Sequence, residues 1–219
     1  MSNDLRIVAF TLVAATLSTA LIAIPGVAAG HWLARHRGGA RGLVETLLSL
    51  PLVLPPTAVG LLLLRALGPH GPIGGALEAL AMSVVFSARG VVVATAVMSF
   101  PLLVRSARTA FEEVDPRLAQ VARTLGATPL RAFLRVTLPL ARRGVLAGLV
   151  LAFARALGEF GATILVAGNI EGETQTLALA IFQRTQTGDD AGATRLVAIT
   201  VALAFAALLG TELLQRRPR

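Results

Sequence analysis

Two opposite charges inside an apolar stretch are the residues of this sequence that most need a chemical explanation. Arg155 and Glu159 lie four residues apart within FARALGEFGATILV. On a helix this spacing places both side chains on one face, where each charge can partly neutralise the other. A lone charge at the centre of a bilayer costs at least about 2.5–3.5 kcal/mol. The pair therefore indicates either a structural ion pair or, with Phe160, Gly161 and Thr163, a gate or path for an anion.

Several kinds of site are excluded by residues that the sequence lacks. All 20 basic residues are arginine, so the chain has no P-loop, whose lysine reaches the nucleotide phosphates, and any ATP hydrolysis must come from another chain. The absence of cysteine removes disulfides and thiolate metal sites. His31, His36 and His70 do not have metal-ligand spacing, and no HExxH or GxSxG motif is present. We expect no enzyme active site, no cofactor and no metal.

The longest polar interruption in the sequence, residues 115–139, predicts two short helices joined by a tight turn. Asp115 is a suitable N-cap, and the proline that follows it suits the first helical position. Gly126 is expected to end the first helix by adopting the left-handed backbone conformation. Four apolar residues recur at i, i+3, i+4 and i+7 and form one stripe: Leu118, Val121, Ala122 and Leu125.

The second helix of this pair is predicted to start in the same way and to end before the next apolar run. Thr128 and Pro129 repeat the cap and proline, and Leu138-Pro139 is expected to end the helix. An amphipathic pair between apolar spans must bury its stripe against its own bundle, the membrane surface or a partner. A basic connector that only fixes topology is the alternative, because basic amphipathic helices beside membranes are common.

The spacing within residues 115–139 resembles the EAA loop of ATP-binding-cassette (ABC) importer permeases. That loop has the pattern Glu-Ala-Ala, three residues, Gly, nine residues, a branched apolar residue, one residue and Leu-Pro. Five residues hold the corresponding places: Ala122, Gly126, Val136, Leu138 and Pro139. Gln120 and Val121 replace the first two letters, so the carboxylate of the family pattern is absent. The resemblance implies that this segment docks on an ATPase, with Leu118, Val121, Leu125 and Gly126 at the contact.

Composition predicts a single membrane domain over residues 1–219. Of the 219 residues 55% are hydrophobic, and the mean hydropathy is +0.74. The net charge of +8 does not indicate nucleic-acid binding, because aromatic residues make up only 5% and the arginines lie mostly where apolar runs end. Since about 20 apolar residues cross a bilayer, we predict an all-α polytopic protein with about five transmembrane helices, at 7–34, 43–67, 91–110, 144–167 and 196–214. The weakly apolar piece 76–87 leaves a sixth open.

The second predicted span is unusual because it contains three prolines, Pro51, Pro55 and Pro56. Prolines leave backbone carbonyls without their helical partners. Such irregular backbone is tolerated at membrane depth only when it is buried in protein or lines a wet cavity. The span is therefore either a kinked packing helix or a broken helix beside a transport path.

The distribution of arginines predicts the topology. If residues 115–139 are cytoplasmic, five spans also place the 35–42 loop and the C-terminus in the cytoplasm. The regions 35–42, 105–143 and 216–219 hold 3, 8 and 3 arginines, 14 of the 20, as the positive-inside rule requires. The N-terminus and the polar loop after the fourth span, which encloses a short apolar piece at 177–182, are then extracytoplasmic.

Beyond the EAA loop, the resemblance extends over nearly the whole chain. The segments LPLVLPPTAVG, MSFPLLVR, ARTLGA, ARALGEFGATI and NIEGETQT resemble the permease subunit of molybdate importers, whose relatives carry tungstate or sulfate. The resemblance implies a permease homodimer surrounded by membrane lipid, two cytoplasmic ATPase subunits and an extracytoplasmic oxyanion-binding protein. It also implies the cytoplasmic (inner) membrane of a bacterium or archaeon. It favours molybdate and leaves sulfate and tungstate open.

A secondary transporter or a channel is the alternative of a different class. Either would also need broken helices and charge within the membrane, but neither would need a docking loop, and secondary transporters often show internal repeats. The sequence has no such repeat. An adjacent reading frame that encodes a P-loop ATPase would favour the importer.

Overall fold

The computed structural model describes residues 3–79 and 82–215, and in these residues every regular element is a helix. This confirms the predicted all-α class. The helices are α1 (Asn3–Arg35), α2 (Gly39–Val53), α3 (Pro56–Leu67), α4 (Gly74–Ala79), α5 (Ala88–Glu112), α6 (Pro116–Thr124), α7 (Pro129–Ala132), the π-helix η1 (Phe133–Thr137), α8 (Leu138–Leu157), α9 (Gly161–Ala167), α10 (Leu177–Thr187) and α11 (Asp190–Gln215).

Within the described residues, four helical runs are long and apolar enough to cross a membrane. They are α1, α5, the continuous run Pro129–Leu157 and most of α11, and the bent pair α2–α3 would be a fifth. The prediction of about five transmembrane helices is therefore confirmed. Of the weakly apolar piece 76–87, residues 80–81 lie outside the described part, and the rest contains only the end of the short helix α4.

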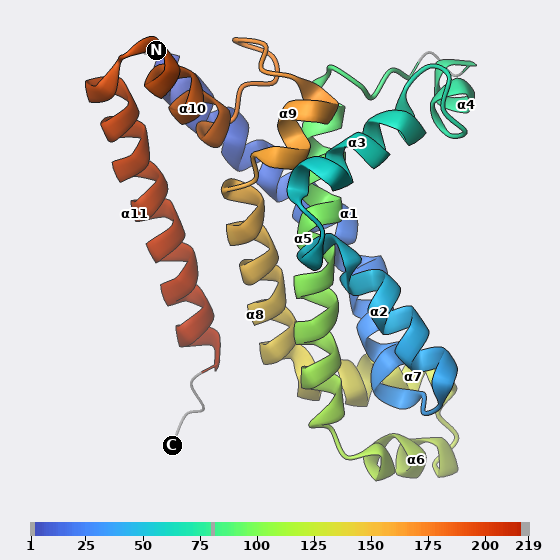
Figure 1. Ribbon diagram of the computed structural model, residues 1–219. Coiled ribbons are helices and arrows are strands. Elements are labelled where there is room, and N and C mark those ends of the chain that lie inside the picture. Colours follow the sequence, from blue (N-terminus) through green and yellow to red (C-terminus); the bar gives the residue numbers. More distant parts are fainter. Residues whose placement is uncertain (1–2, 80–81, 216–219) are drawn as a thin grey trace.

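Helix α5 lies at the centre of the bundle and packs against α1, α8 and α9 (Figure 1). Small residues let these helices approach closely, as is usual between membrane helices. A Cβ atom at Gly30 of α1 would lie 2.7 Å from the Cβ atom of Ala107, and one at Gly144 of α8 would lie 2.5 Å from that of Ala110. The side chain of Phe111 is fully buried at the same level. Glycine and alanine thus bring the backbones of the three long helices close together, and larger side chains such as Phe111 fill the remaining core.

The predicted second span is broken sharply, by 109°, between α2 and α3. Leu54 has an extended backbone with ψ of 145°, as expected for a residue that precedes a proline. Pro55 is also non-helical, and Pro56 opens α3 at its first position, where the missing N–H has no consequence. The consecutive prolines thus explain the break, so the span is broken and not merely kinked, while its place beside a transport path stays a prediction.

The predicted continuous helix over 144–167 is wrong. Helix α8 ends at Leu157, and α9 begins only at Gly161. Gly158 terminates α8, and glycine is a weak helix former. The apolar residues on both sides of this second break hid it from the hydropathy pattern.

The predicted helix end at Leu138-Pro139 is also wrong, because the chain continues from α7 through η1 into α8. The Leu138 N–H bonds to the Phe133 carbonyl, five residues back. This wide turn explains how the helix accommodates Pro139, because it replaces the ordinary α-helical hydrogen bonds just before the proline.

The short apolar piece expected at 177–182 is the first part of helix α10. The Thr176 hydroxyl accepts a hydrogen bond from the Leu179 N–H, and the Thr11 hydroxyl of α1 accepts one from the Leu177 N–H at 2.9 Å. The helix therefore starts against α1, which the local sequence pattern did not reveal.

The helix bundle has two ends, which carry different loops and short helices (Figure 1). At the end that carries α6, Arg41 pairs with Glu112 at 2.8 Å, which places the 35–42 loop beside the end of α5. At the end that carries α10, Asp4 of α1 pairs with Arg184. We call these the α6 end and the α10 end. The last described turn of α11 points towards the α6 end, so the relative arrangement of loops agrees with five crossings.

Candidate functional site

The helix pair predicted within residues 115–139 is confirmed in its local structure. The Asp115 carboxylate accepts a hydrogen bond from the Arg117 N–H at 2.9 Å and caps α6. The Thr128 hydroxyl accepts one from the Arg131 N–H at 3.3 Å and caps α7. Gly126 between them has φ of +88°, the left-handed conformation that glycine adopts without strain. We call residues 115–139 the hairpin segment.

The apolar stripe of α6 is not covered by any other part of residues 3–79 and 82–215. The exposed fractions of Leu118, Val121 and Leu125 are 47%, 55% and 83%, and no residue of α6 is buried. Leu130 and Leu134 of the second helix are also at least half exposed. Since apolar surface gains roughly 25 cal/mol per Å² when it leaves water, a stripe of this kind favours contact with a partner or a membrane surface.

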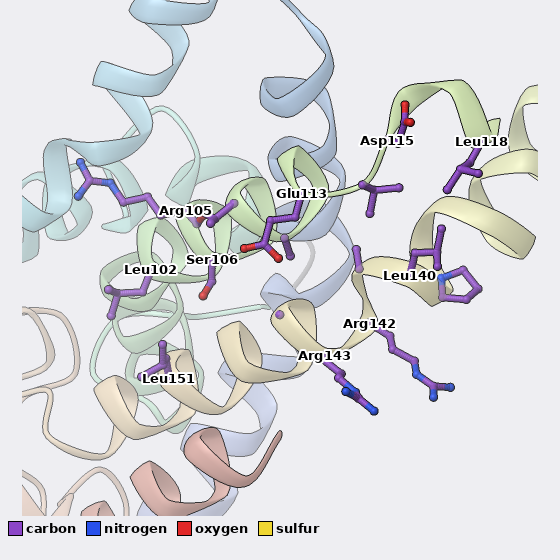
Figure 2. Close-up of a pocket in the computed structure, with 16 residues that line it drawn as sticks. Leu102, Arg105, Ser106, Glu113, Asp115, Leu118, Leu140, Arg142, Arg143 and Leu151 are labelled. Atoms are coloured by element: carbon purple, nitrogen blue, oxygen red, sulfur yellow. The ribbon is translucent and has the colours of Figure 1, made fainter. Parts of the chain in front are cut away.

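The other residues of the EAA pattern do not all lie on this stripe. Gln120 is exposed and Ala122 half-buried on α6. Val136 lies in the π-helix, and Leu138 packs against the core cluster that contains Ala107 and Phe111. Pro139 is exposed and, with Leu118, borders a groove between α5 and α8 (Figure 2). The structure therefore separates an exposed α6 surface from residues that anchor the hairpin segment to the bundle.

The two helix breaks lie against each other. A Cβ atom at Gly161, the first residue of α9, would lie 2.7 Å from the Cβ atom of Pro56, the first residue of α3. One at Gly60 would lie 2.9 Å from the Cα atom of Ala162. The structure thus brings together predicted path residues that are about a hundred positions apart, while Pro51 lies inside α2, about one turn before its break.

Arg155 and Glu159 form the predicted ion pair, although they do not share one helix. Their side chains are 2.7 Å apart, and the exposed fractions are 30% for Arg155 and 1% for Glu159. The other carboxylate oxygen of Glu159 accepts a hydrogen bond from the Ala162 N–H at 2.9 Å. Because backbone N–H groups at a helix start lack helical partners, Glu159 connects the last turn of α8 to the first turn of α9 across the break.

The remaining predicted path residues have different surroundings. The ring of Phe160 lies 5.0 Å from that of Phe182 on α10. The Thr163 hydroxyl is fully buried, and the described residues offer it no hydrogen-bond partner; the same holds for Ser99 of α5. Phe160 thus ties the second break to α10, whereas Thr163 faces the interior.

Sequence reasoning missed an ion-pair network at the α6 end. Arg108 pairs with Glu112 at 2.8 Å and with Glu45 of α2, and Glu112 also pairs with Arg41. The spacing of Arg108 and Glu112 was a readable signal, but nothing local indicated their partners. Such partly exposed pairs contribute about 0–1 kcal/mol each. They align α2 with α5 beside the hairpin segment. No group of metal-binding side chains occurs in the described residues.

Comparisons with known proteins agree on one family. The family model described as "Binding-protein-dependent transport system inner membrane component" matches residues 26–219. The chain is 51% identical to the molybdenum transport system permease protein ModB of Escherichia coli (strain K12), over 82% of this chain and 79% of that protein. It is 39% identical to ModB of Azotobacter vinelandii, over 94% of this chain and 92% of that protein.

Solved structures show the same fold. A chain of a bacterial alginate ABC transporter superposes with a TM-score of 0.73 at 19% identity, covering 99% of this chain and 80% of that one. A chain of the MetNI methionine ABC transporter in an inward-facing conformation superposes with a TM-score of 0.69 at 18% identity, covering 97% of this chain and 96% of that one.

Proposed function

The chain belongs to the family of binding-protein-dependent transport system inner membrane components, and from this premise we propose that it is the permease subunit of an ABC importer for molybdate. The observation that carries the proposal is the 39–51% identity, over most of the chain, to permeases named for molybdenum transport. The exposed stripe on α6 supports the same proposal, because it is an apolar surface that nothing in the described part of the chain covers.

The hairpin segment is the contact with a separate ATPase. Leu118, Val121 and Leu125 enter an apolar cleft of the ATPase, and the side-chain-free turn at Gly126 permits close backbone approach. Gln120 and Ala122 flank this contact, while Val136, Leu138 and Pro139 connect it to α8. When the ATPase subunits close on ATP, they move the hairpin segments, and the spans follow as rigid bodies.

The two helix breaks form the gate of the oxyanion path. The irregular backbone at Pro55 and Pro56 meets the second break, where Gly161 packs closely against Pro56, and Pro51 lies one turn earlier in α2. Arg155 and Glu159 hold the second break in position. Phe160 and Thr163 complete its walls. The path needs no ring of fixed charges, because backbone N–H groups can stabilise an anion, and selection of the oxyanion rests with a binding protein.

The proposed assembly has two copies of the permease, two ATPase subunits and an extracytoplasmic oxyanion-binding protein. The α6 end, with the 35–42 loop and the C-terminus, faces the cytoplasm, because most arginines lie in these regions. The permease does not hydrolyse ATP itself, since it has no lysine with which to build a P-loop.

Reconstituted transport tests the proposal. Proteoliposomes that contain the permease, its ATPase and its binding protein should accumulate molybdate only when ATP is supplied on the α6 side. Competition with tungstate and sulfate then ranks the substrates. Stronger inhibition by sulfate than by unlabelled molybdate would assign the chain to sulfate import, and uptake without ATP or ATPase would instead support a secondary transporter or channel.

A further inference from the structure

A large groove at the α6 end is not used by the proposed transport path. It lies between α5 and α8, has a volume of about 1110 Å³, and is closed at one end by the start of α6 (Figure 2). Its floor is mostly apolar and includes Leu102 of α5 and Leu151 of α8. The Ser106 side chain adds a hydroxyl between the two helices.

Three arginines form the edges of this groove. Figure 2 shows Arg105 extending from α5 at one edge, and Arg142 and Arg143 extending from α8 at the other. All three are exposed, and within the described residues no hydrogen bond or ion pair involves their guanidinium groups. The neighbouring Arg41 and Arg108, in contrast, are both paired with carboxylates. The groove therefore presents unused positive charge beside an apolar surface.

Two carboxylates also line the groove, and they reduce this charge without cancelling it. The Asp115 carboxylate already accepts a hydrogen bond from the Arg117 N–H at the start of α6. Glu113 projects into the groove from α5, is exposed, and has no side-chain partner in the described part of the chain. Three guanidinium groups face two carboxylates, so the lining remains net positive, and Glu113 opposes the binding of any anion.

The apolar floor extends well beyond Arg142 and Arg143. Leu151 is eight residues after Arg143 in the same helix, which at a rise of 1.5 Å per residue is about 12 Å deeper along α8. A free tetrahedral oxyanion would occupy the charged edge and leave this apolar length uncovered. A phospholipid has a phosphate group for the edge and acyl chains for the floor. Basic pockets between transmembrane helices on the cytoplasmic side are known to bind anionic headgroups.

We propose that this groove binds an anionic phospholipid. The headgroup phosphate lies at the α8 edge beside Arg142 and Arg143, Arg105 on the opposite edge adds positive charge to the lining, and an acyl chain lies along Leu102 and Leu151. The inference does not depend on which oxyanion the protein transports. Since the groove adjoins Leu118 and Asp115 at the start of the hairpin segment, the bound lipid stabilises the junction between that segment and the bundle.

Lipid binding to the purified full-length chain tests this proposal directly. Native mass spectrometry should show retention of phosphatidylglycerol in preference to phosphatidylcholine. The double variant Arg142→Gln/Arg143→Gln and the single variant Arg105→Gln should bind phosphatidylglycerol more weakly, by about fivefold per arginine removed. Glu113→Gln should bind it more tightly, because the opposing charge is gone. Arg89→Gln is the matched control, since Arg89 is exposed at the α10 end of α5 and its loss should leave binding unchanged.

Several outcomes would overturn the proposal. Equal retention of the two lipids by the unaltered chain would do so, as would an equal loss of binding in Arg89→Gln. Displacement of the lipid by millimolar inorganic sulfate would assign the arginines to a free oxyanion, and protection of the groove only on dimerisation would assign it to a second copy. If the arginine variants fail to fold, two measurements still test the proposal: the lipid preference of the unaltered chain and the tighter phosphatidylglycerol binding expected for Glu113→Gln.

Discussion

The carboxylate of Glu159 has one partner on each side of a helix break, and this arrangement limits what can replace it. Arg155 in α8 supplies the charge partner, and the Ala162 N–H in α9 supplies a second donor. The sequence predicted the ion pair from its spacing, but it could not show the backbone partner, because the pattern indicated an unbroken helix. A buried backbone donor without an acceptor costs about 1–3 kcal/mol, so the carboxylate contributes more than its charge.

Replacement of Glu159 should therefore separate its two roles. Glu159→Gln keeps an oxygen that can accept from the Ala162 N–H, whereas Glu159→Ala loses both interactions and should be the less stable. Arg155→Gln leaves a buried carboxylate without its cation, a loss on the order of 3–5 kcal/mol if the site stays dry. Exchanging the two residues should not restore stability, because an arginine at 159 cannot accept the hydrogen bond. Folded yield and thermal stability in detergent measure these effects; equal stability of the Gln and Ala variants would refute the backbone role.

Gly126 is the residue at which the backbone conformation of the hairpin segment is most sensitive to substitution. Its φ of +88° is strained for a β-branched residue, although a Cβ atom there would meet no neighbour within 4 Å. Gly126→Val should impair ATP-driven uptake or co-purification with the ATPase while the spans stay folded.

Gly172→Val is the matched control for this prediction. Gly172 has φ of +81° and equally open surroundings, but it lies in the loop between α9 and α10. Both variants should lose a similar amount of stability, on the order of 1–2 kcal/mol. Normal uptake and normal co-purification in Gly126→Val would contradict the role of the turn. Equal losses of ATP-driven uptake in the two variants would contradict it as well.

At the scale of the helices, the sequence predicted how elements begin better than how they end. Capping residues followed by proline marked the starts of α6 and α7, and the structure has both caps. The break at 158–160 was missed because apolar residues continue through it, and the junction at Pro139 was missed because a π-turn has no simple residue pattern. The contact between the two breaks depends on tertiary packing, which one-dimensional periodicity does not contain.

That contact predicts a specific packing defect. Gly60→Ala would place a methyl group 2.9 Å from the Cα atom of Ala162, and backbone cannot move aside as a flexible side chain can. Overpacking of this kind costs typically about 1–3 kcal/mol, so the thermal unfolding temperature should fall. Gly42→Ala in α2 is the control, because its added methyl group meets nothing within 4 Å and should stabilise the helix by about 0.5–1 kcal/mol. A fall in Gly42→Ala equal to that in Gly60→Ala would show that the contact is not responsible.

At the scale of the whole molecule, the distribution of arginines and the directions of the helices indicate the same topology. The structure places the 35–42 loop beside the end of α5 and the start of α1 beside α10, as alternation of five spans predicts. The arginine-rich regions 35–42 and 105–143 thereby share the α6 end, towards which α11 also runs. Composition could indicate this arrangement because topology follows from charge at the ends of spans, whereas the ion pairs that align those ends had to come from the structure.

Reporter fusions test the orientation of these ends. A reporter inserted after Arg37 or attached at the C-terminus should behave as cytoplasmic, and one inserted within residues 187–191 should behave as extracytoplasmic. The physical reason is the uneven distribution of arginines between the two ends of the spans, which favours retention of the arginine-rich loops in the cytoplasm. The reverse pattern would contradict the five-span arrangement.

The most direct test of the central claim, that a separate ATPase docks on the hairpin segment, is site-directed crosslinking. The chain contains no cysteine, so Leu125→Cys introduces a single reactive thiol at the most exposed position of the α6 stripe. Gly172→Cys provides the matched thiol near the α10 end. With the ATPase partner carrying cysteines around its apolar cleft, oxidation should join it to Leu125→Cys and not to Gly172→Cys. Crosslinks at position 172, or none at position 125 in a complex that still transports, would contradict the account.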